Sequence, residues 1–242
     1  TEVYEVASFY HHFDIIKSDQ KKPPALTVRV CDSVTCEING ANELAQNLDD
    51  YFKGTIRIQK VPCIGRCQNA PVAVVKFNPI DNANLKNVKQ AVDARDYLPS
   101  IPNYLDMEEY IKKDGYKLFE KVKNNDAEKE RVLKELEDSN LRGLGGAGFP
   151  AGKKWRILKE QNAPRLLAVN IDEGEPGTFK DRYYLESDPH RFFEGMLIAS
   201  EVVGIDKIYI YLRDEYAAVR KIMTDELQKI KSKYKNSIPQ IE

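Results

Sequence analysis

The sequence predicts an α/β protein of two domains. Segments with strand and helix patterns alternate on both sides of a break marked by Pro99 and Pro102. Hydrophobic residues make up 42% of the 242 residues, which is sufficient for packed cores. The 37 Lys and Arg residues nearly balance the 38 Asp and Glu residues, so no basic excess is available to bind a nucleic-acid backbone. We therefore expect one domain over residues 1–100 and a second over residues 101–242.

Residues 25–96 predict the elements of a small α/β domain. Residues 25–31 alternate and are rich in β-branched side chains, which is typical of a strand. Residues 41–52 place their apolar side chains on one face of a helix. Residues 55–61 and 72–77 predict two further strands, and residues 87–95 predict a closing helix. This order suits helices packed on one sheet.

The second domain repeats the alternation. Residues 106–139 are highly charged but keep an apolar stripe at helical spacing, which predicts amphipathic helices. Residues 165–170 and 207–212 predict strands, and residues 216–230 a helix. Between these two strands we expect a helix over residues 188–203, because its Asp and Pro at the start are favoured at the N-cap and first helical positions.

The four cysteines, Cys31, Cys36, Cys63 and Cys67, form a C-x4-C and a C-x3-C pair separated by 26 residues, each at the exit of a predicted strand. Disulfides require an oxidising compartment, and no export signal is visible. Structural zinc sites usually space their cysteines as C-x2-C, whereas four thiolates in wider loops suit a [2Fe–2S] cluster. The spacing favours the cluster and leaves zinc open. Gly40 and Gly65 lie in these loops, where a flexible backbone would help N–H groups to point at the sulfurs.

The residues around the cysteines resemble one family. Residues 4–10 (YEVASFY), residues 30–36 with Gly40, and residues 62–71 (PCIGRCQNAP) are similar to the thioredoxin-like [2Fe–2S] subunit of respiratory complex I and its relatives in NAD-linked formate dehydrogenases and hydrogenases. The resemblance implies a thioredoxin-like fold in which the four cysteines ligate the cluster. Family members carry a helical bundle before the YEVASFY stretch. Because the chain begins at Thr1 without Met, we expect a fragment or a processed chain.

A glycine-rich loop opens the second domain. Gly143, Gly145, Gly146 and Gly148 satisfy G-x-G-x-x-G, but a charged helix precedes them where the dinucleotide fingerprint requires a strand. The ordinary Rossmann interpretation therefore does not apply. A flexible loop is one alternative, and close approach of backbone N–H groups to a ligand phosphate is the interpretation that we favour.

A polar segment follows the predicted strand at residues 165–170. Asn170, Asp172, Glu173 and Glu175 lie where open α/β sheets bind their ligands, at the carboxyl end of a strand. A helix N-cap or an exposed turn is the alternative. No Ser-His-Asp or Cys-His pattern accompanies the segment, and we expect no proton-transfer role for His190.

These two motifs also resemble a family. Residues 143–155 (GLGGAGFPAGKKW) and 170–182 (NIDEGEPGTFKDR) are similar to the FMN- and NADH-binding subunit of complex I and of the same formate dehydrogenases. The resemblance implies that the glycine loop with Lys154 holds FMN. It also implies that Phe149 and Glu175 contact NAD(H), with Glu175 as the candidate catalytic residue. The implied cofactor-binding residues are Gly143, Gly145, Gly146, Ala147, Gly148, Phe149, Lys154, Asn170, Asp172 and Glu173.

Three positions refine the resemblance. Leu144 and Gly174 stand where complex I members usually have Arg and Ser, and with residues 188–191 they look more like the formate-dehydrogenase branch. Ile157 replaces an aromatic residue that often assists adenine stacking. The family's second flavin-binding segment and its [4Fe–4S] domain are expected beyond residue 242.

The sequence thus predicts a thioredoxin-like [2Fe–2S] ferredoxin domain followed by a truncated Rossmann-like α/β domain for FMN and NAD(H). We expect a diaphorase subunit of an NAD-dependent formate dehydrogenase. The alternatives are the NADH dehydrogenase module of complex I, an NAD-linked hydrogenase, or a stand-alone [2Fe–2S] electron carrier without flavin. The expected partners are other subunits of a redox complex, among them a catalytic subunit with further iron–sulfur clusters. We expect a cytoplasmic protein with no transmembrane segment and no nucleic-acid partner.

Overall fold

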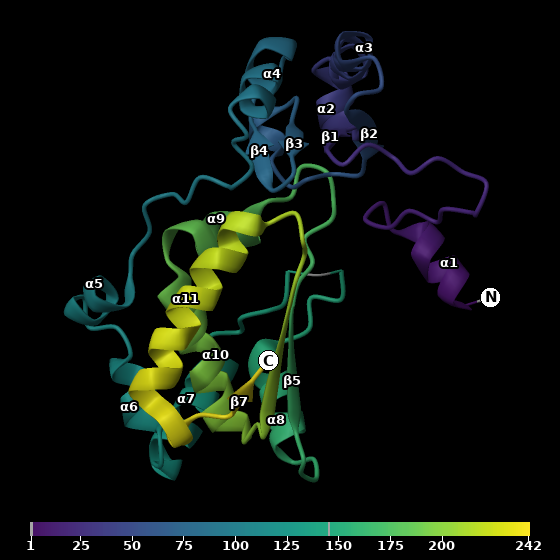
Figure 1. Cartoon of the computed structure of the whole chain (residues 1–242). Helices are drawn as coiled ribbons and strands as arrows, with labels where there is room; N and C mark the ends of the chain where they lie inside the picture. Colours follow the sequence, from purple (N-terminus) through teal and green to yellow (C-terminus); the bar gives the residue numbers. More distant parts are fainter. Residues whose placement is uncertain (1, 145) are drawn as a thin grey trace. The chain divides into compact units, whose positions relative to one another are not determined.

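The computed structural model describes residues 2–144 and 146–242 and divides the chain into two compact units. The first comprises Thr1–Ser100 together with Glu173–Phe179, and the second comprises Ile101–Asp172 and Lys180–Glu242. Each unit has its own sheet and its own apolar core (Figure 1). A short segment that follows the first strand of the second unit therefore belongs to the first unit.

The first unit is a four-stranded mixed sheet with helices. Its strands lie in the order β2-β1-β3-β4, with β1 parallel to β2 and antiparallel to β3. The elements are α1 (Glu2–Phe9), β1 (Thr27–Cys31), α2 (Val34–Ile38), α3 (Ala41–Phe52), β2 (Arg57–Val61), η1 (Cys67–Asn69), β3 (Ala73–Val75), β4 (Asn78–Ile80) and α4 (Leu85–Asp93). The predicted helix over residues 41–52 is confirmed at both ends. The predicted strands are present but shorter.

The amphipathic pattern explains α3. Leu44, Leu48 and Phe52 are buried on one face, while the opposite face is exposed. Among the elements of this unit that the sequence did not predict, α2 and β4 lack such a pattern. In α2 only Cys36 is buried, and β4 has three residues with a proline at its centre. Neither gives a periodic apolar signal.

The second unit is a parallel sheet in the order β5-β6-β7 with helices packed on it. Its elements are α5 (Met107–Lys112), α6 (Lys117–Val122), α7 (Asp126–Asp138), α8 (Ala151–Lys159), β5 (Leu166–Ile171), α9 (Lys180–Ser187), α10 (Pro189–Val203), β6 (Lys207–Leu212), α11 (Ala217–Tyr234), η2 (Lys235–Ser237) and β7 (Gln240–Ile241). The predicted N-cap is confirmed, because the Asp188 side chain accepts a hydrogen bond of 3.2 Å from the backbone N–H of Arg191. Within residues 2–144 and 146–242, no helix combines the length and apolarity needed to cross a bilayer.

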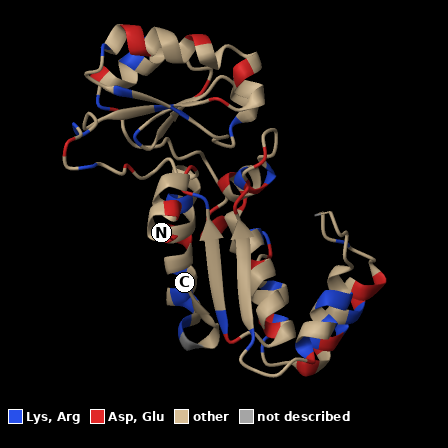
Figure 2. Ribbon diagram, turned by 90° about the vertical axis from the view of Figure 1, so that its right-hand side faces the viewer, with Lys and Arg blue, Asp and Glu red and all other residues tan. Residues whose placement is uncertain are grey.

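The helices α7 and α8 pack closely at a glycine and are joined by ion pairs. A Cβ added to Gly152 would lie 2.6 Å from the backbone nitrogen of Glu137, so no larger residue fits there without movement. The Arg156 guanidinium bonds both carboxylate oxygens of Glu137, at 2.9 and 2.8 Å, and also pairs with Glu130 at 2.7 Å. Figure 2 shows acidic and basic residues on the helices of this unit; α7 carries both signs, whereas the charged residues of α8 are all basic. Gly152 is therefore a packing glycine, and it does not belong to the ligand loop that precedes it.

A buried polar network joins α10 and α11 to the segments before them. His190 and Glu226 are both fully buried. The imidazole of His190 lies 2.7 Å from the Tyr116 hydroxyl through Nδ1 and 2.8 Å from the Glu226 carboxylate through Nε2. The Tyr104 hydroxyl and the Lys229 ammonium donate to the other Glu226 oxygen at 2.8 and 2.7 Å. Every side-chain polar atom of the His–Glu pair therefore has a partner.

The pKa directions agree with a neutral imidazole in this network. Burial lowers the pKa of His190 below its usual 6.5, although Glu226 opposes the shift. Burial raises the pKa of Tyr116, which therefore keeps its proton and donates it to Nδ1. Burial also pushes the pKa of Glu226 upward, but hydrogen bonds from Lys229, Tyr104 and His190 outweigh it, so that this pKa lies below 4.5. The neutral ring then donates from Nε2–H to a charged carboxylate.

Replacing His190 with leucine is expected to lower the free energy of unfolding by about 1–3 kcal/mol, because Tyr116 and Glu226 each lose a buried partner. Urea unfolding followed by circular dichroism measures the change. The control is Gln228→Leu, an exposed position on the same helix as Glu226, for which we expect a change below about 0.5 kcal/mol. Equal free energies of unfolding for the two variants would show that the network does not stabilise this unit.

The stability of the wild-type chain is expected to fall as the pH decreases below about 6.5. The unfolded chain binds a proton at His190 in this range, whereas the folded chain, with its lowered pKa, does not. A second loss follows below 4.5, where the unfolded chain protonates Glu226 before the folded chain does. Unfolding free energies measured between pH 5 and 8 test the first step. The His190→Leu variant should show a flatter profile there, and a wild-type profile of the same slope would contradict the assignment.

Candidate functional site

The parallel pairing of β1 and β2 brings the two cysteine pairs together. Cys31 ends β1 and pairs in register with Val61, the last residue of β2, so Cys63 follows at the same edge of the sheet. Cys36 lies in α2, directly after β1, and Cys67 begins η1. The first three thiols are buried, and Cys67 is half-buried. Residues far apart in sequence thus meet because parallel strands end at a common edge.

The sulfur atoms contact one another. The Sγ atoms of Cys63 and Cys67 lie 3.4 Å apart. Cys31 accepts hydrogen bonds from the thiols of Cys36 and Cys63, and these lower its pKa far below the usual 9.0. The pKa values of Cys36 and Cys63 are raised, first because each donates to the Cys31 thiolate and then because of burial. Among the four cysteines, the thiolate form is thus favoured most strongly at Cys31.

Backbone N–H groups act on the sulfurs. Those of Ser33 and Ile64 contribute to the lowered pKa of Cys31, and that of Val72 opposes the raised pKa of Cys36. Hydrogen bonds run from Gly65 to Cys63, at 3.3 Å, and from Gly177 to Cys67, at 3.1 Å. Such donors stabilise thiolates that ligate iron, so the four-thiol arrangement fits a [2Fe–2S] cluster.

The two glycines of the cysteine loops have different roles. Gly65 itself donates to a sulfur, that of Cys63. Gly40 instead donates its N–H to the carbonyl of Glu37 at 3.0 Å and closes the end of α2. The donor missed by the sequence analysis is Gly177, which lies 110 residues from the cysteine that it contacts. No local pattern could have indicated it.

Hydrogen bonds to Asp81 hold the loop that carries Cys63 and Cys67. The guanidinium of Arg66 bonds both carboxylate oxygens of Asp81 at 2.6 Å. The Asn69 amide donates to the same carboxylate at 2.7 Å. Bidentate geometry of this kind fixes a guanidinium in place, so the loop from Cys63 to Cys67 is anchored to the turn after β4.

The glycine loop of the second unit is closed at its base and open at its tip. The N–H of Gly143 donates to the Phe149 carbonyl at 3.0 Å, and the N–H of Ala151 donates to the Leu141 carbonyl at 2.8 Å. Gly146 and Ala147 are exposed at the tip, and a Cβ added to Gly146 would meet nothing within 4 Å. The predicted residue Gly145 lies outside the described residues. The accessible backbone of this loop fits the close approach of a phosphate group.

The other candidates of this segment lie on or beside α8. Lys154 is exposed in the first turn of the helix, and Phe149 is 44% exposed just before it. Gly148 is half-buried with φ of 53°, a conformation that favours glycine. Leu144 and Ile157 are exposed at 92% and 42%, so packing does not explain the choice of either residue.

The acidic segment is divided between the units. Asn170 is exposed near the end of β5, and its side-chain oxygen accepts a bond of 2.8 Å from the N–H of Asp172. Both residues belong to the second unit, whereas Glu173 and Glu175 belong to the first. Glu173 is buried, and Glu175 is exposed at the start of a turn. Of the four predicted polar residues, Asn170 and Asp172 thus lie at the end of a strand of the second unit, whereas Glu173 and Glu175 lie in a segment of the first unit.

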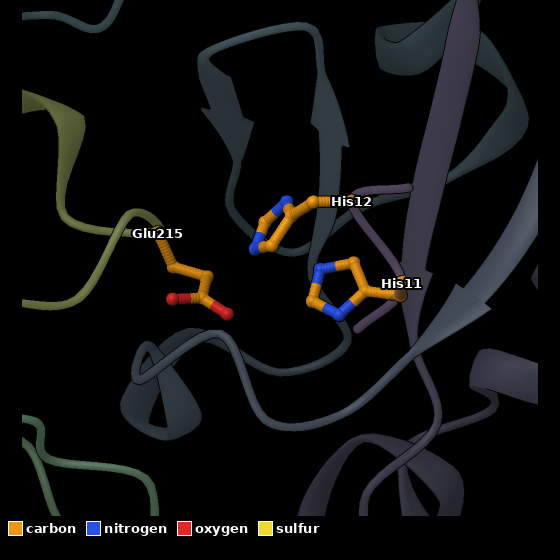
Figure 3. A group of neighbouring side chains, drawn as sticks. All are labelled: His11, His12 and Glu215. Carbon is orange, nitrogen blue, oxygen red and sulfur yellow. The ribbon is translucent and has the colours of Figure 1, made fainter. Parts of the chain in front are cut away.

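Two neighbouring histidines were not assigned a role by the sequence. The rings of His11 and His12 lie 4.0 Å apart between centroids and are drawn in Figure 3. Both belong to the first unit, whereas Glu215, also labelled there, belongs to the second. Two imidazoles fall short of the four ligands of a structural zinc site, and the pair carries no assignment.

Comparison with known proteins defines the class of each unit. Residues 1–96 match the family model of the thioredoxin-like [2Fe–2S] ferredoxin, and residues 136–242 match the Nuo51 FMN-binding domain. The chain therefore joins a thioredoxin-like [2Fe–2S] domain to an FMN-binding domain of the complex I 51 kDa type. The predicted fold class is confirmed, and so are the two cofactor classes, [2Fe–2S] and FMN.

The relatives of the chain come from two kinds of enzyme complex. The chain is 43% identical over 132 residues to a subunit of the NADH-quinone oxidoreductase of Aquifex aeolicus, an alignment that covers 54% of the chain and 30% of the relative. It is 28% identical over 263 residues to the NAD-reducing hydrogenase HoxS subunit alpha of Cupriavidus necator, covering 95% and 43%. A crystal structure of an NAD+-reducing [NiFe]-hydrogenase superposes with a TM-score of 0.78 at 27% identity, over 100% of the chain and 45% of its counterpart. The chain thus spans less than half the length of these relatives.

Replacing Cys63 with alanine is expected to abolish the cluster, because this sulfur contacts both Cys31 and Cys67. The absorption and electron paramagnetic resonance spectra of the anaerobically purified chain measure the loss. An unchanged circular dichroism spectrum would show that the fold survives. Retention of the full cluster signal would contradict ligation by Cys63.

Proposed function

We propose that this chain is the electron-transfer, or diaphorase, part of an NAD(H)-dependent oxidoreductase that contains FMN and iron–sulfur clusters. The observation that carries the proposal is the convergence of four cysteine sulfurs, two of which accept hydrogen bonds from backbone N–H groups, in a chain that also contains an FMN-binding domain. When bound, FMN supplies hydride chemistry and the cluster supplies one-electron chemistry. The protein supplies binding, position and electrostatics.

The four cysteines hold the cluster in this proposal. Burial of Cys31, Cys36 and Cys63 excludes water from most of the ligands. The backbone N–H groups offset part of the negative charge that four thiolates bring together. Zinc, which the cysteine spacing left open, loses support because the matched family model is a [2Fe–2S] ferredoxin.

The glycine loop holds the FMN phosphate in this proposal. Gly143, Gly146, Ala147 and Gly148 supply backbone for this contact, and the loop runs into the N-terminus of α8. Gly145 is included in the proposed set on its sequence position alone. Lys154, in the first turn of that helix, adds a positive charge. Anions are stabilised at helix N-termini because the first backbone N–H groups have no partner within the helix.

Asn170, Asp172 and Glu173 line the flavin in this proposal, and Phe149 and Glu175 contact NAD(H). Exposed carboxylates suit ribose or carboxamide hydrogen bonds, and an aromatic ring suits stacking on adenine. Hydride transfer needs no general acid or base, in keeping with the absence of a proton-relay pattern from the sequence motifs. Glu175 therefore acts as a positioning contact for the nicotinamide nucleotide.

The relatives bear on the parent complex. They are named as an NADH-quinone oxidoreductase and an NAD-reducing hydrogenase, so we favour these two complexes over a formate dehydrogenase. Leu144 and Gly174, which look like the formate-dehydrogenase branch, are the residues that favour that third possibility. The partner in each case is a catalytic subunit with further iron–sulfur clusters that exchanges electrons with the cofactors of this chain.

An absorption spectrum of the anaerobically purified chain, reconstituted with iron, sulfide and FMN, tests the proposal. We expect flavin bands and [2Fe–2S] bands together, with bleaching of the flavin by NADH. Cluster bands alone would indicate the stand-alone electron carrier. A colourless protein would overturn both functions.

Replacing Gly146 with valine is expected to weaken FMN binding by at least about tenfold, or about 1.4 kcal/mol, because the side chain occupies the space that the phosphate approaches. The fold should not change, since an added Cβ meets nothing within 4 Å. Fluorescence titration with FMN measures the affinity. The contrasting variant Gly152→Val should instead unfold the α7–α8 pair, because its Cβ meets the Glu137 backbone. An unchanged FMN affinity of Gly146→Val would contradict the proposal that this loop binds the FMN phosphate.

A further inference from the structure

The segment Glu173–Phe179 contains a tight turn with one backbone donor that the turn itself does not use. The N–H of Thr178 donates to the carbonyl of Glu175 at 3.0 Å and closes the turn. Pro176 and Gly177 occupy the two central positions, and Gly177 has φ of 88°. Pro followed by Gly with positive φ is the signature of a type II turn. In such a turn the N–H of the second central residue takes no part in the closing hydrogen bond.

That donor points at a cysteine. The N–H of Gly177 lies 3.1 Å from Sγ of Cys67, and both residues belong to the first unit. Cys67 is the least buried of the four cysteines, so a donor at this sulfur replaces a contact that water would otherwise make. The N–H donor to Cys63, by contrast, is Gly65, which is only two residues away in sequence.

A hydrogen bond to a ligand sulfur changes the energies of the two redox states unequally. Reduction adds one electron, and therefore one negative charge, to a cluster that four thiolates already make anionic. An N–H···S bond stabilises the more negative state more strongly, so it raises the reduction potential. Loss of the bond lowers that potential without removing any ligand.

We propose that the Glu175–Thr178 turn sets the reduction potential of the [2Fe–2S] cluster through the Gly177 N–H on Cys67. This inference rests on the proposed function, in which the four cysteines bind the cluster. Glu175, the proposed contact for NAD(H), opens the same turn, so a shift of Glu175 that rotates the turn also moves the donor. The segment thus links the nucleotide contact to the ease of reducing the cluster.

Three variants test the proposal by redox titration of the anaerobic, cluster-loaded chain, followed by electron paramagnetic resonance. Gly177→Val introduces a β-branched residue at positive φ, so the turn must rearrange and withdraw the donor. We expect the equilibrium constant for reduction to fall about tenfold, which is ~59 mV for a one-electron couple. Gly177→Asn tolerates positive φ and keeps the N–H, and should stay within about threefold of the wild type.

Gly54→Val is the matched control for strain. Gly54 has φ of 75° and lies before β2, at the opposite end of that strand from Cys63. This variant should destabilise the unit while leaving the potential unchanged. A fall in potential of equal size in Gly54→Val and Gly177→Val would overturn the proposal, as would an unchanged potential in Gly177→Val.

A second measurement does not require the valine variant to assemble. In protein labelled with ¹⁵N-glycine, pulsed electron paramagnetic resonance of the reduced cluster should detect couplings from Gly65 and Gly177, and Gly177→Asn should lose the second. Identical spectra of the two proteins would overturn the contact. If the wild-type chain forms no cluster, the proposed function itself is wrong. If the cluster forms but its reduction potential is the same in Gly177→Val as in the wild type, only this inference is wrong.

Discussion

The parallel pairing of β1 with β2 is the constraint on which the sulfur cluster depends. It places Cys31 and Cys63 at one edge of the sheet, and the short elements that follow each strand then carry Cys36 and Cys67 to them. An antiparallel pairing would send the two strand ends to opposite edges. The same edge concentrates backbone N–H groups at the turn out of each strand, which offsets the charge that gathering four thiols creates. The topology of the sheet thus determines which residues can surround the four cysteine sulfurs.

The second unit solves a different electrostatic problem. A carboxylate at zero exposure, Glu226, is tolerated because Lys229, Tyr104 and His190 all donate to it. The network leaves the imidazole neutral and orients it between a hydroxyl and a carboxylate. Buried polar groups of this kind stabilise only when every member is satisfied, and they favour one packing of α10 against α11. His190 is therefore a structural residue, as its position in a first helical turn indicated.

The segment Glu173–Phe179 connects the chemistry of the two motifs. It follows β5 of the second unit in sequence, but it belongs to the first unit, where the Gly177 N–H donates to Cys67. The turn that provides this donor owes its geometry to Pro176 and Gly177, and it begins at Glu175. Glu175, a predicted ligand contact, and Gly177, which contacts the Cys67 sulfur, are therefore only two positions apart. Pro176 and Gly177 therefore do more than reverse the chain direction, because their turn also orients the Gly177 N–H toward Cys67.

Local patterns alone determined much of this protein. The apolar face of Ala41–Phe52, the cap at Asp188 and the strand-exit positions of the cysteines depend on neighbours within a few residues, and all were predictable. Only the tertiary structure decided which glycines serve which role. Gly65 donates to a sulfur, Gly40 closes a helix, and Gly152 allows two helices to touch. The Gly177 contact spans 110 residues. Sequence periodicity reports what a segment does with its own neighbours, whereas these contacts depend on how distant backbones meet.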